Sequence, residues 1–152
     1  MTVDKYASLK LENQLCFPLY AVSKEIIRRY KPSLDKLDLT YTQYITMMVM
    51  WEKKQVNVKE LGEKLLLDSG TLTPVLKKLE HKGYITRERS RADERNLIVR
   101  VTDKGMALED EALFVPKQMA CSLALSREEA ETLYTLLHKL LAHMEENNPS
   151  GN

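Results

Sequence analysis

The sequence predicts a mainly α-helical chain with one small β-hairpin, and three observations support this prediction. Residues that cap helices precede apolar runs with helical spacing at several places along the chain. Two short β-rich runs flank one charged loop, the pattern of a hairpin. The intervening turns are short, and no repeat or low-complexity tract interrupts them. The expected fold class is therefore mainly α with a small β-hairpin.

Composition indicates one ordinary globular domain over residues 1–152, with 43% hydrophobic and 30% charged residues. No apolar run approaches the ~20 residues of a membrane span, and the N-terminus lacks the apolar core of a signal peptide. We therefore expect a cytoplasmic protein and no membrane partner. Two cysteines are too few for a disulfide scaffold, and His138 and His143 lack the spacing of a helical zinc pair. Because phosphate-loop and nucleophile motifs are also absent from the sequence, we expect no metal, no cofactor and no enzyme.

The first helix has a proline near its start and another near its end. Proline is tolerated in the first turn of a helix, so Pro18 indicates a start between Asn13 and Phe17. We expect this helix to end at about Tyr30, before Pro32. Cys16 would then lie at the helix start, where the helix dipole favours the thiolate anion.

Three further helices are predicted from their N-terminal caps. Thr40 and Asn57 each begin a capping-box pattern, the first before a helix through residue 51 and the second before a short helix. Asp68 or Ser69 can cap a helix that ends at Gly83, since glycine is favoured just past a helix C-terminus.

The pattern then changes from helical to β. Runs 84–86 and 97–101 flank the charged loop 90–96, and Thr102 caps a helix towards residue 115 that Pro116 kinks or ends. A last helix opens with a capping box at Ser126, and its leucines follow helical spacing: Leu133, Leu136, Leu137, Leu140 and Leu141. Two helices joined by a tight turn and followed by a hairpin predict a winged helix-turn-helix at about 40–102, with dimerisation helices at about 9–31 and 103–146.

Positive charge is concentrated between residues 64 and 100, which hold 9 basic and 5 acidic residues. The motifs of this stretch, among them 69–79 and Asp93–Asn96, resemble the MarR family of transcription regulators. The resemblance implies a recognition helix from residue 69 and an arginine of the wing in the minor groove of double-stranded DNA. The small hydroxyls can approach base edges, and the lysines suit phosphates. The expected DNA-binding residues are Ser69, Thr71, Thr73, Lys77, Lys78, Arg87, Asp93 and Arg95.

The segment 11–21, together with 30–32, 39–44 and 67–74, resembles a narrower branch, the organic hydroperoxide resistance repressors. This resemblance implies that Cys16 is the sensor of an organic hydroperoxide and that Tyr30 and Tyr41 donate hydrogen bonds to its thiolate. Some members of the branch use a late cysteine as the resolving thiol of an inter-subunit disulfide. Cys121 lies in the expected region, and a merely packed residue of the dimer core is an equal alternative.

The sequence therefore predicts a homodimeric redox-sensing repressor that binds a pseudo-palindromic operator and releases it when Cys16 is oxidised. Two alternatives remain open at this stage. One is a MarR-type regulator released by a small aromatic ligand, and the other is a thiol peroxidase that uses Cys16 catalytically.

Overall fold

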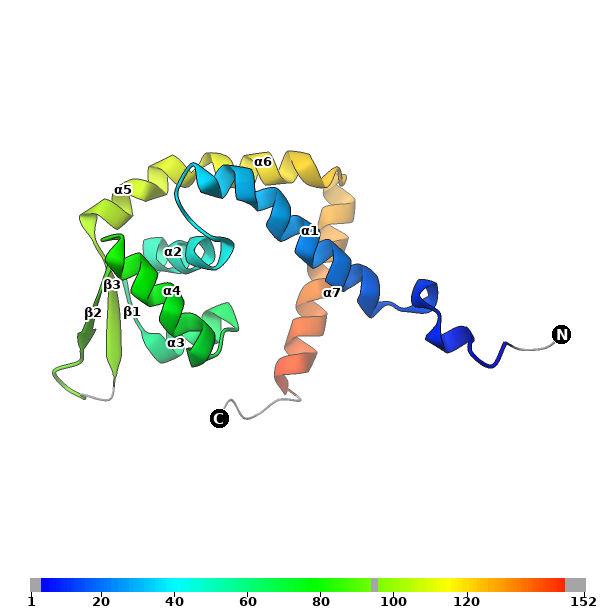
Figure 1. Cartoon of the computed structure of the whole chain (residues 1–152), viewed down its shortest axis with the longest axis horizontal. Helices are drawn as coiled ribbons and strands as arrows, with labels where there is room; N and C mark the ends of the chain where they lie inside the picture. The colour runs from blue at the N-terminus through cyan, green and yellow to red at the C-terminus, as the bar shows by residue number, and fades with distance from the viewer. Residues whose placement is uncertain (1–3, 94–95, 147–152) are drawn as a thin grey trace.

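A computed structural model describes residues 4–93 and 96–146 of the chain, so Arg95 lies outside the described residues. Two short 3-10 turns, Ala7–Leu9 and Leu11–Asn13, precede the first helix. The helices are α1 (Cys16–Asp35), α2 (Tyr41–Lys53), α3 (Val58–Leu65), α4 (Ser69–His81), α5 (Asp103–Ala112), α6 (Phe114–Leu123) and α7 (Arg127–Glu146), and the strands are β1 (Gln55–Asn57), β2 (Ile85–Arg89) and β3 (Leu97–Val101). Figure 1 shows a lobe of α2, α3, α4 and the sheet, with α1, α5 and α6 above it. The predicted class, mainly helical with a winged helix-turn-helix, is confirmed.

The predicted end of the first helix is wrong, because α1 continues through Pro32 to Asp35. Proline removes one helical hydrogen bond, but the turn that follows it is held by packing and by a polar contact. Leu34 is 2% exposed, and the Ser33 hydroxyl donates to Gln118 Oε1 of α6 at 2.5 Å. These contacts offset the missing bond. The predicted start is confirmed, since Cys16 is the first residue of α1.

The caps of the lobe form largely as predicted. The Thr40 hydroxyl accepts from the Gln43 N–H and Gln43 Oε1 accepts from the Thr40 N–H, which completes a capping box. Asn57 Oδ1 accepts from the Glu60 N–H, and of the two candidates at the start of α4 the cap is Asp68. Gly83 has φ +78°, which glycine adopts without the penalty of a side chain.

The predicted hairpin is part of a three-stranded antiparallel sheet with the order β1-β3-β2. The short strand β1 pairs Val56 with Val99 and was not predicted, because three residues are too few to show a periodicity. The core lies between this sheet and α2 to α5, and its fully buried side chains include Met47, Met50, Leu61, Leu72, Leu76, Leu79, Ile85 and Val99.

The helix after Thr102 ends at Ala112, and a separate helix, α6, begins at Phe114. Pro116 lies in the first turn of α6, where its missing N–H costs least. The sequence therefore indicated the break but not the second helix. At the other end of α5, an added Cβ on Gly105 would lie 2.2 Å from the Tyr84 carbonyl oxygen, so only glycine fits there.

The helix α7 and the N-terminal part of α1 stand apart from this core (Figure 1). No residue of α7 is buried, although Ser126 and Glu129 form the predicted capping box. Across the described residues, no helix combines the length and apolar character that crossing a bilayer requires. An extended helix with an apolar stripe needs a surface to bury it.

Candidate DNA-reading and redox sites

The first turn of α4 is organised by one carboxylate. Asp68 Oδ1 accepts from the Thr71 N–H at 2.9 Å and Asp68 Oδ2 accepts from the Thr71 hydroxyl at 2.9 Å. These two donors, the N–H first, hold the pKa of the Asp68 carboxyl below its usual value. Asp68 is therefore ionised at neutral pH and satisfies the N-terminal end of α4.

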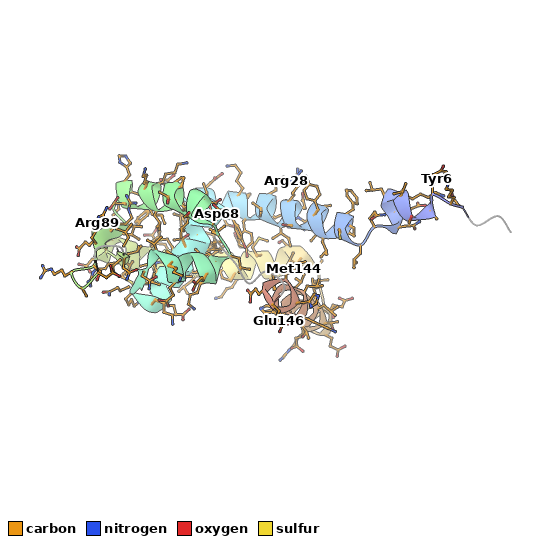
Figure 2. All side chains as sticks on the ribbon, turned by 90° about the horizontal axis from the view of Figure 1, so that it is seen from below. Tyr6, Arg28, Asp68, Arg89, Met144 and Glu146 are labelled. Carbon is orange, nitrogen blue, oxygen red and sulfur yellow. The ribbon has the colours of Figure 1, made fainter. Side chains whose placement is uncertain are left out.

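The predicted reading residues lie on the outer side of α4. Leu72, Val75, Leu76 and Leu79 form its buried face, whereas Ser69, Thr71, Lys77 and Lys78 are exposed and Thr73 is half-buried. In Figure 1 the N-terminal end of α4 and the C-terminal end of β2 both point to the lower side of the molecule, which Figure 2 views directly, with Asp68 and Arg89 labelled. The helix end and the wing can therefore face one surface together.

The wing is joined to α4 by an ion pair. Arg87 Nε and Nη2 donate to Glu80 Oε2 at 3.1 and 2.6 Å. These bonds from Arg87 hold the pKa of the Glu80 carboxyl below its usual value. With its guanidinium engaged in this way, Arg87 is suited to setting the angle between wing and helix. Asp93 Oδ2 accepts from Asn96 Nδ2 at 3.1 Å in the turn between the strands, and the predicted groove contact of Arg95 lies outside the described residues.

Cys16 is exposed at the N-terminal end of α1. Large apolar side chains around it are also uncovered, with Leu15 at 75% and Phe17 at 42% exposure. Within the described part of the chain, this thiol is open to water and accessible to a small oxidant.

Tyr30 and Tyr41 meet at the other end of α1. Their ring centroids lie 4.9 Å apart, and the ring of Tyr44 lies 6.0 Å from that of Tyr30. Burial raises the pKa of Tyr30 and of Tyr41, and the neighbouring Tyr41 raises that of Tyr30 further. Both phenols therefore keep their protons at neutral pH and can donate hydrogen bonds.

The two parts of the predicted sensor do not meet within one chain. Tyr30 follows Cys16 by 14 residues on the same helix, a separation of about 21 Å at 1.5 Å per residue. A tyrosine side chain cannot span that distance. Because α1 is continuous, the end that carries Tyr30 does not fold back on Cys16 within one chain.

Cys121 is exposed near the end of α6. Arg29 Nη1 donates to the carbonyl of the adjacent Ser122 at 2.7 Å, which fixes this end of α6 beside the middle of α1. Arg29 is 13 residues beyond Cys16, or about 20 Å along the helix. A disulfide needs Cα atoms within roughly 7 Å, so this arrangement separates Cys16 from Cys121 of the same chain.

Sequence reasoning missed three of these contacts: the Thr71 hydroxyl to Asp68, Arg87 to Glu80, and Arg29 to Ser122. The first has a local signal, because an Asp three residues before a Thr at a helix start is a capping pattern. The other two join separate elements and have none. Among the described residues, no three His, Cys, Asp or Glu side chains gather where they could hold a metal ion.

Comparison with known proteins adds relatives that match nearly the whole chain. The family described as "Transcriptional regulator SarA/Rot" matches residues 28–112. The organic hydroperoxide resistance transcriptional regulator of Bacillus subtilis is 46% identical over 144 residues, covering 90% of this chain and 96% of the relative. A MarR variant from E. coli, solved with operator DNA, is 27% identical with a TM-score of 0.79, over 91% of this chain and 99% of that one.

The structure is also similar to AbfR of Staphylococcus epidermidis in two redox states. Reduced AbfR bound to DNA is 34% identical, covers 92% of this chain and 98% of its own, and gives a TM-score of 0.75. Disulfide-formed AbfR is 35% identical, with 93% of this chain and 97% of that chain covered, and gives a TM-score of 0.60. This chain therefore matches the reduced, DNA-bound form better than the disulfide form.

Proposed function

This chain belongs to the MarR family of transcriptional regulators, in the branch of the organic hydroperoxide resistance repressors, and we propose that it forms a homodimer that releases its operator when Cys16 is oxidised. The B. subtilis relative is a regulator of organic hydroperoxide resistance, and AbfR and the MarR variant were solved with DNA. By analogy the partner is a pseudo-palindromic operator in the cytoplasm, read by two lobes in successive major grooves.

One observation carries the proposal: about 21 Å of helix separates Cys16, which lies amid uncovered apolar side chains, from Tyr30, whose ring contacts Tyr41 of the same chain. The stripe on α7 is equally uncovered, with Leu133, Leu136, Leu137, Leu140 and Leu141 between 37% and 53% exposed. A second copy packed on these faces would bury them and bring Tyr30 and Tyr41 of the partner subunit to Cys16. The dimer thus completes a sensor that one chain lacks.

The proposed chemistry begins with attack by the Cys16 thiolate on the terminal oxygen of an organic hydroperoxide. An S–O bond forms while the O–O bond breaks, and the departing alkoxide takes a proton to give the alcohol. Cysteine is oxidised to sulfenic acid and the peroxide is reduced. Protonated Tyr30 and Tyr41 would stabilise the thiolate beforehand by donating hydrogen bonds to sulfur.

A second step can fix the oxidised state. The Cys121 thiol of the partner subunit attacks the Cys16 sulfenic sulfur, an S–S bond forms, and the hydroxyl leaves as water with the thiol proton. The protein acts stoichiometrically in this scheme and is not an enzyme.

The proposal is tested by fluorescence anisotropy with an operator fragment, before and after one equivalent of cumene hydroperoxide. We expect wild type to lose DNA on oxidation and to recover it with dithiothreitol, while Cys16→Ser binds DNA in both conditions. Equal loss in Cys16→Ser would rule out Cys16 as the sensor. Release by a small aromatic acid without oxidant would favour the ligand-responsive alternative, and rapid multi-turnover peroxide consumption would favour the peroxidase.

A further inference from the structure

The hydroxyl of Thr71 is held in one direction by Asp68. It lies 2.9 Å from Asp68 Oδ2, while the Thr71 N–H bonds to Asp68 Oδ1 at the same distance. Both residues are exposed at the start of α4. The contact therefore combines a helix cap with a side-chain bond on the surface expected to face DNA.

The protons of this pair can be counted. An ionised carboxylate only accepts hydrogen bonds, whereas a threonine hydroxyl has one proton and two lone pairs. The pKa of Asp68 is lowered by the two Thr71 donors, so the carboxyl has no proton to give at neutral pH. Thr71 must therefore be the donor, and its oxygen keeps only acceptor capacity for another partner.

Thr71 lies on the exposed side of α4. The next residue, Leu72, is 1% exposed and packs into the core, while Thr71, Pro74 and Lys78 follow one another at helical spacing on the exposed side. Lys78 is suited to a phosphate. Thr71 lies almost two turns nearer the helix start and is suited to a base edge, because the N-terminal residues of a recognition helix contact base edges.

We propose that Thr71 is a specificity-determining residue that accepts a hydrogen bond from an amino group in the major groove, adenine N6 or cytosine N4, and that Asp68 fixes this polarity. The inference rests on the proposed binding of operator DNA. At the corresponding edge, guanine presents the acceptors O6 and N7, and thymine presents the acceptor O4. If a base presented an acceptor to Thr71, no proton would lie between that acceptor and the Thr71 oxygen. Leaving these two groups without a hydrogen bond lowers the affinity for that base.

The test is selection and sequencing of bound DNA from a library with a randomised operator half-site. Thr71→Val keeps the backbone N–H that caps α4 and removes the hydroxyl, so it identifies the position that Thr71 reads. There we expect wild type to prefer A or C over G or T by roughly two- to tenfold. Asp68→Asn keeps the capping oxygen, but its amide N–H can donate to Thr71. The Thr71 proton then becomes free for DNA, and the preference should shift toward G or T.

Thr135→Val on α7, outside α4 and the wing, is the matched control and should leave that position unchanged, and thermal unfolding checks that each variant folds. The inference is overturned if Thr71→Val alters no position, if wild type prefers G or T there, or if Asp68→Asn keeps the wild-type preference. If wild type binds all sequences equally, the proposed operator binding fails, and this inference fails with it.

Discussion

Tyr30 lies on the same unbroken helix as Cys16, 14 residues away, so that about 21 Å of helix separates the two residues of one chain. The aromatic ring that Tyr30 does contact is Tyr41, at 4.9 Å. If these phenols stabilise a thiolate, that thiolate belongs to another copy of the chain. Under the proposed function, the sensor is therefore completed only when two chains associate.

Mixed dimers test this directly. Subunits with Cys16→Ser are combined with subunits carrying Tyr30→Phe and Tyr41→Phe. In the mixed dimer, the single remaining Cys16 faces two intact tyrosines from the other subunit, so this thiol should react with peroxide at the wild-type rate. Homodimers of the double Phe variant should react about 10–100-fold more slowly, the effect of losing hydrogen bonds to a charged group.

The measurement is stopped-flow loss of free thiol, with two affinity tags to isolate the mixed species. Slow reaction of the single Cys16 in the mixed dimer would show that tyrosines of the same chain serve Cys16. Operator binding by the reduced variants serves as the control and should stay unchanged, because Tyr30 and Tyr41 lie outside α4 and the wing.

The stripe on α7 predicts where the copies meet. Leu137 is 37% exposed in the single chain, so burying this exposed part in a dimer contributes about 0.5–1 kcal/mol in each subunit. Leu137→Glu adds the cost of burying a charge and should produce monomers at micromolar concentration in analytical ultracentrifugation. Thr135→Glu introduces the same charge on the opposite side of α7 and should remain dimeric. Two variants with equal dissociation would place the interface elsewhere.

The sequence predicted what local patterns encode. Thr40, Asp68 and Ser126 act on residues three positions away, and such caps can be read without a fold. The end of α1 could not be predicted in this way, because Ser33 and Leu34 keep the helix intact through contacts with residues distant in sequence. The candidate sensor residues followed from the family resemblance. The separation of about 21 Å between Cys16 and Tyr30 could be stated only once the structure showed that α1 is unbroken.

The Glu80–Arg87 pair predicts a positioning role for the wing. Arg87→Met and Glu80→Gln should weaken operator binding to a similar extent, and the double variant should be little worse than either, because both remove one contact. A direct phosphate contact by Arg87 would instead make Arg87→Met much the more damaging change.

For Arg95, which is expected to enter the groove, Arg95→Ala should cost ~1–3 kcal/mol of operator affinity. Lys77→Ala should weaken all sequences evenly and reduce the salt dependence.

The same pair predicts a pH effect on stability. The pKa of Glu80 is lowered in the folded protein, so its contribution is present above the ordinary Glu value and is lost as pH falls through the folded value. The pair is partly exposed, so its contribution is below about 1 kcal/mol. Urea unfolding at pH 7 should therefore show a small stability gap between wild type and Glu80→Gln that closes in acid, at pH values below the ordinary pKa of Glu. A gap that persists in acid would assign the stabilisation to packing.

The inter-subunit disulfide is the last prediction. Arg29 anchors the end of α6 about 20 Å from Cys16 of the same chain, so only Cys121 of the partner subunit can approach that thiol without dismantling α1. We expect a reductant-sensitive covalent dimer on non-reducing gels after peroxide, absent from both Cys16→Ser and Cys121→Ser. Within each chain α1 and α6 are joined by Arg29 to Ser122 and Ser33 to Gln118, so closing the bond would shift helices that support the DNA-reading lobe.

Cys121→Ser separates this mechanism from one that uses a single cysteine. If the variant releases DNA on oxidation only when a small thiol is supplied, a mixed disulfide at Cys16 is a sufficient switch and Cys121 is a packed residue. If wild type releases DNA while every chain runs as a monomer on the gel, the inter-subunit bond is wrong. Arg29→Met tests whether the contact between Arg29 and the end of α6 positions Cys121. With the end of α6 released from α1, the covalent dimer should form at a different rate from wild type. Oxidation of Cys16 to sulfenic acid should keep the wild-type rate.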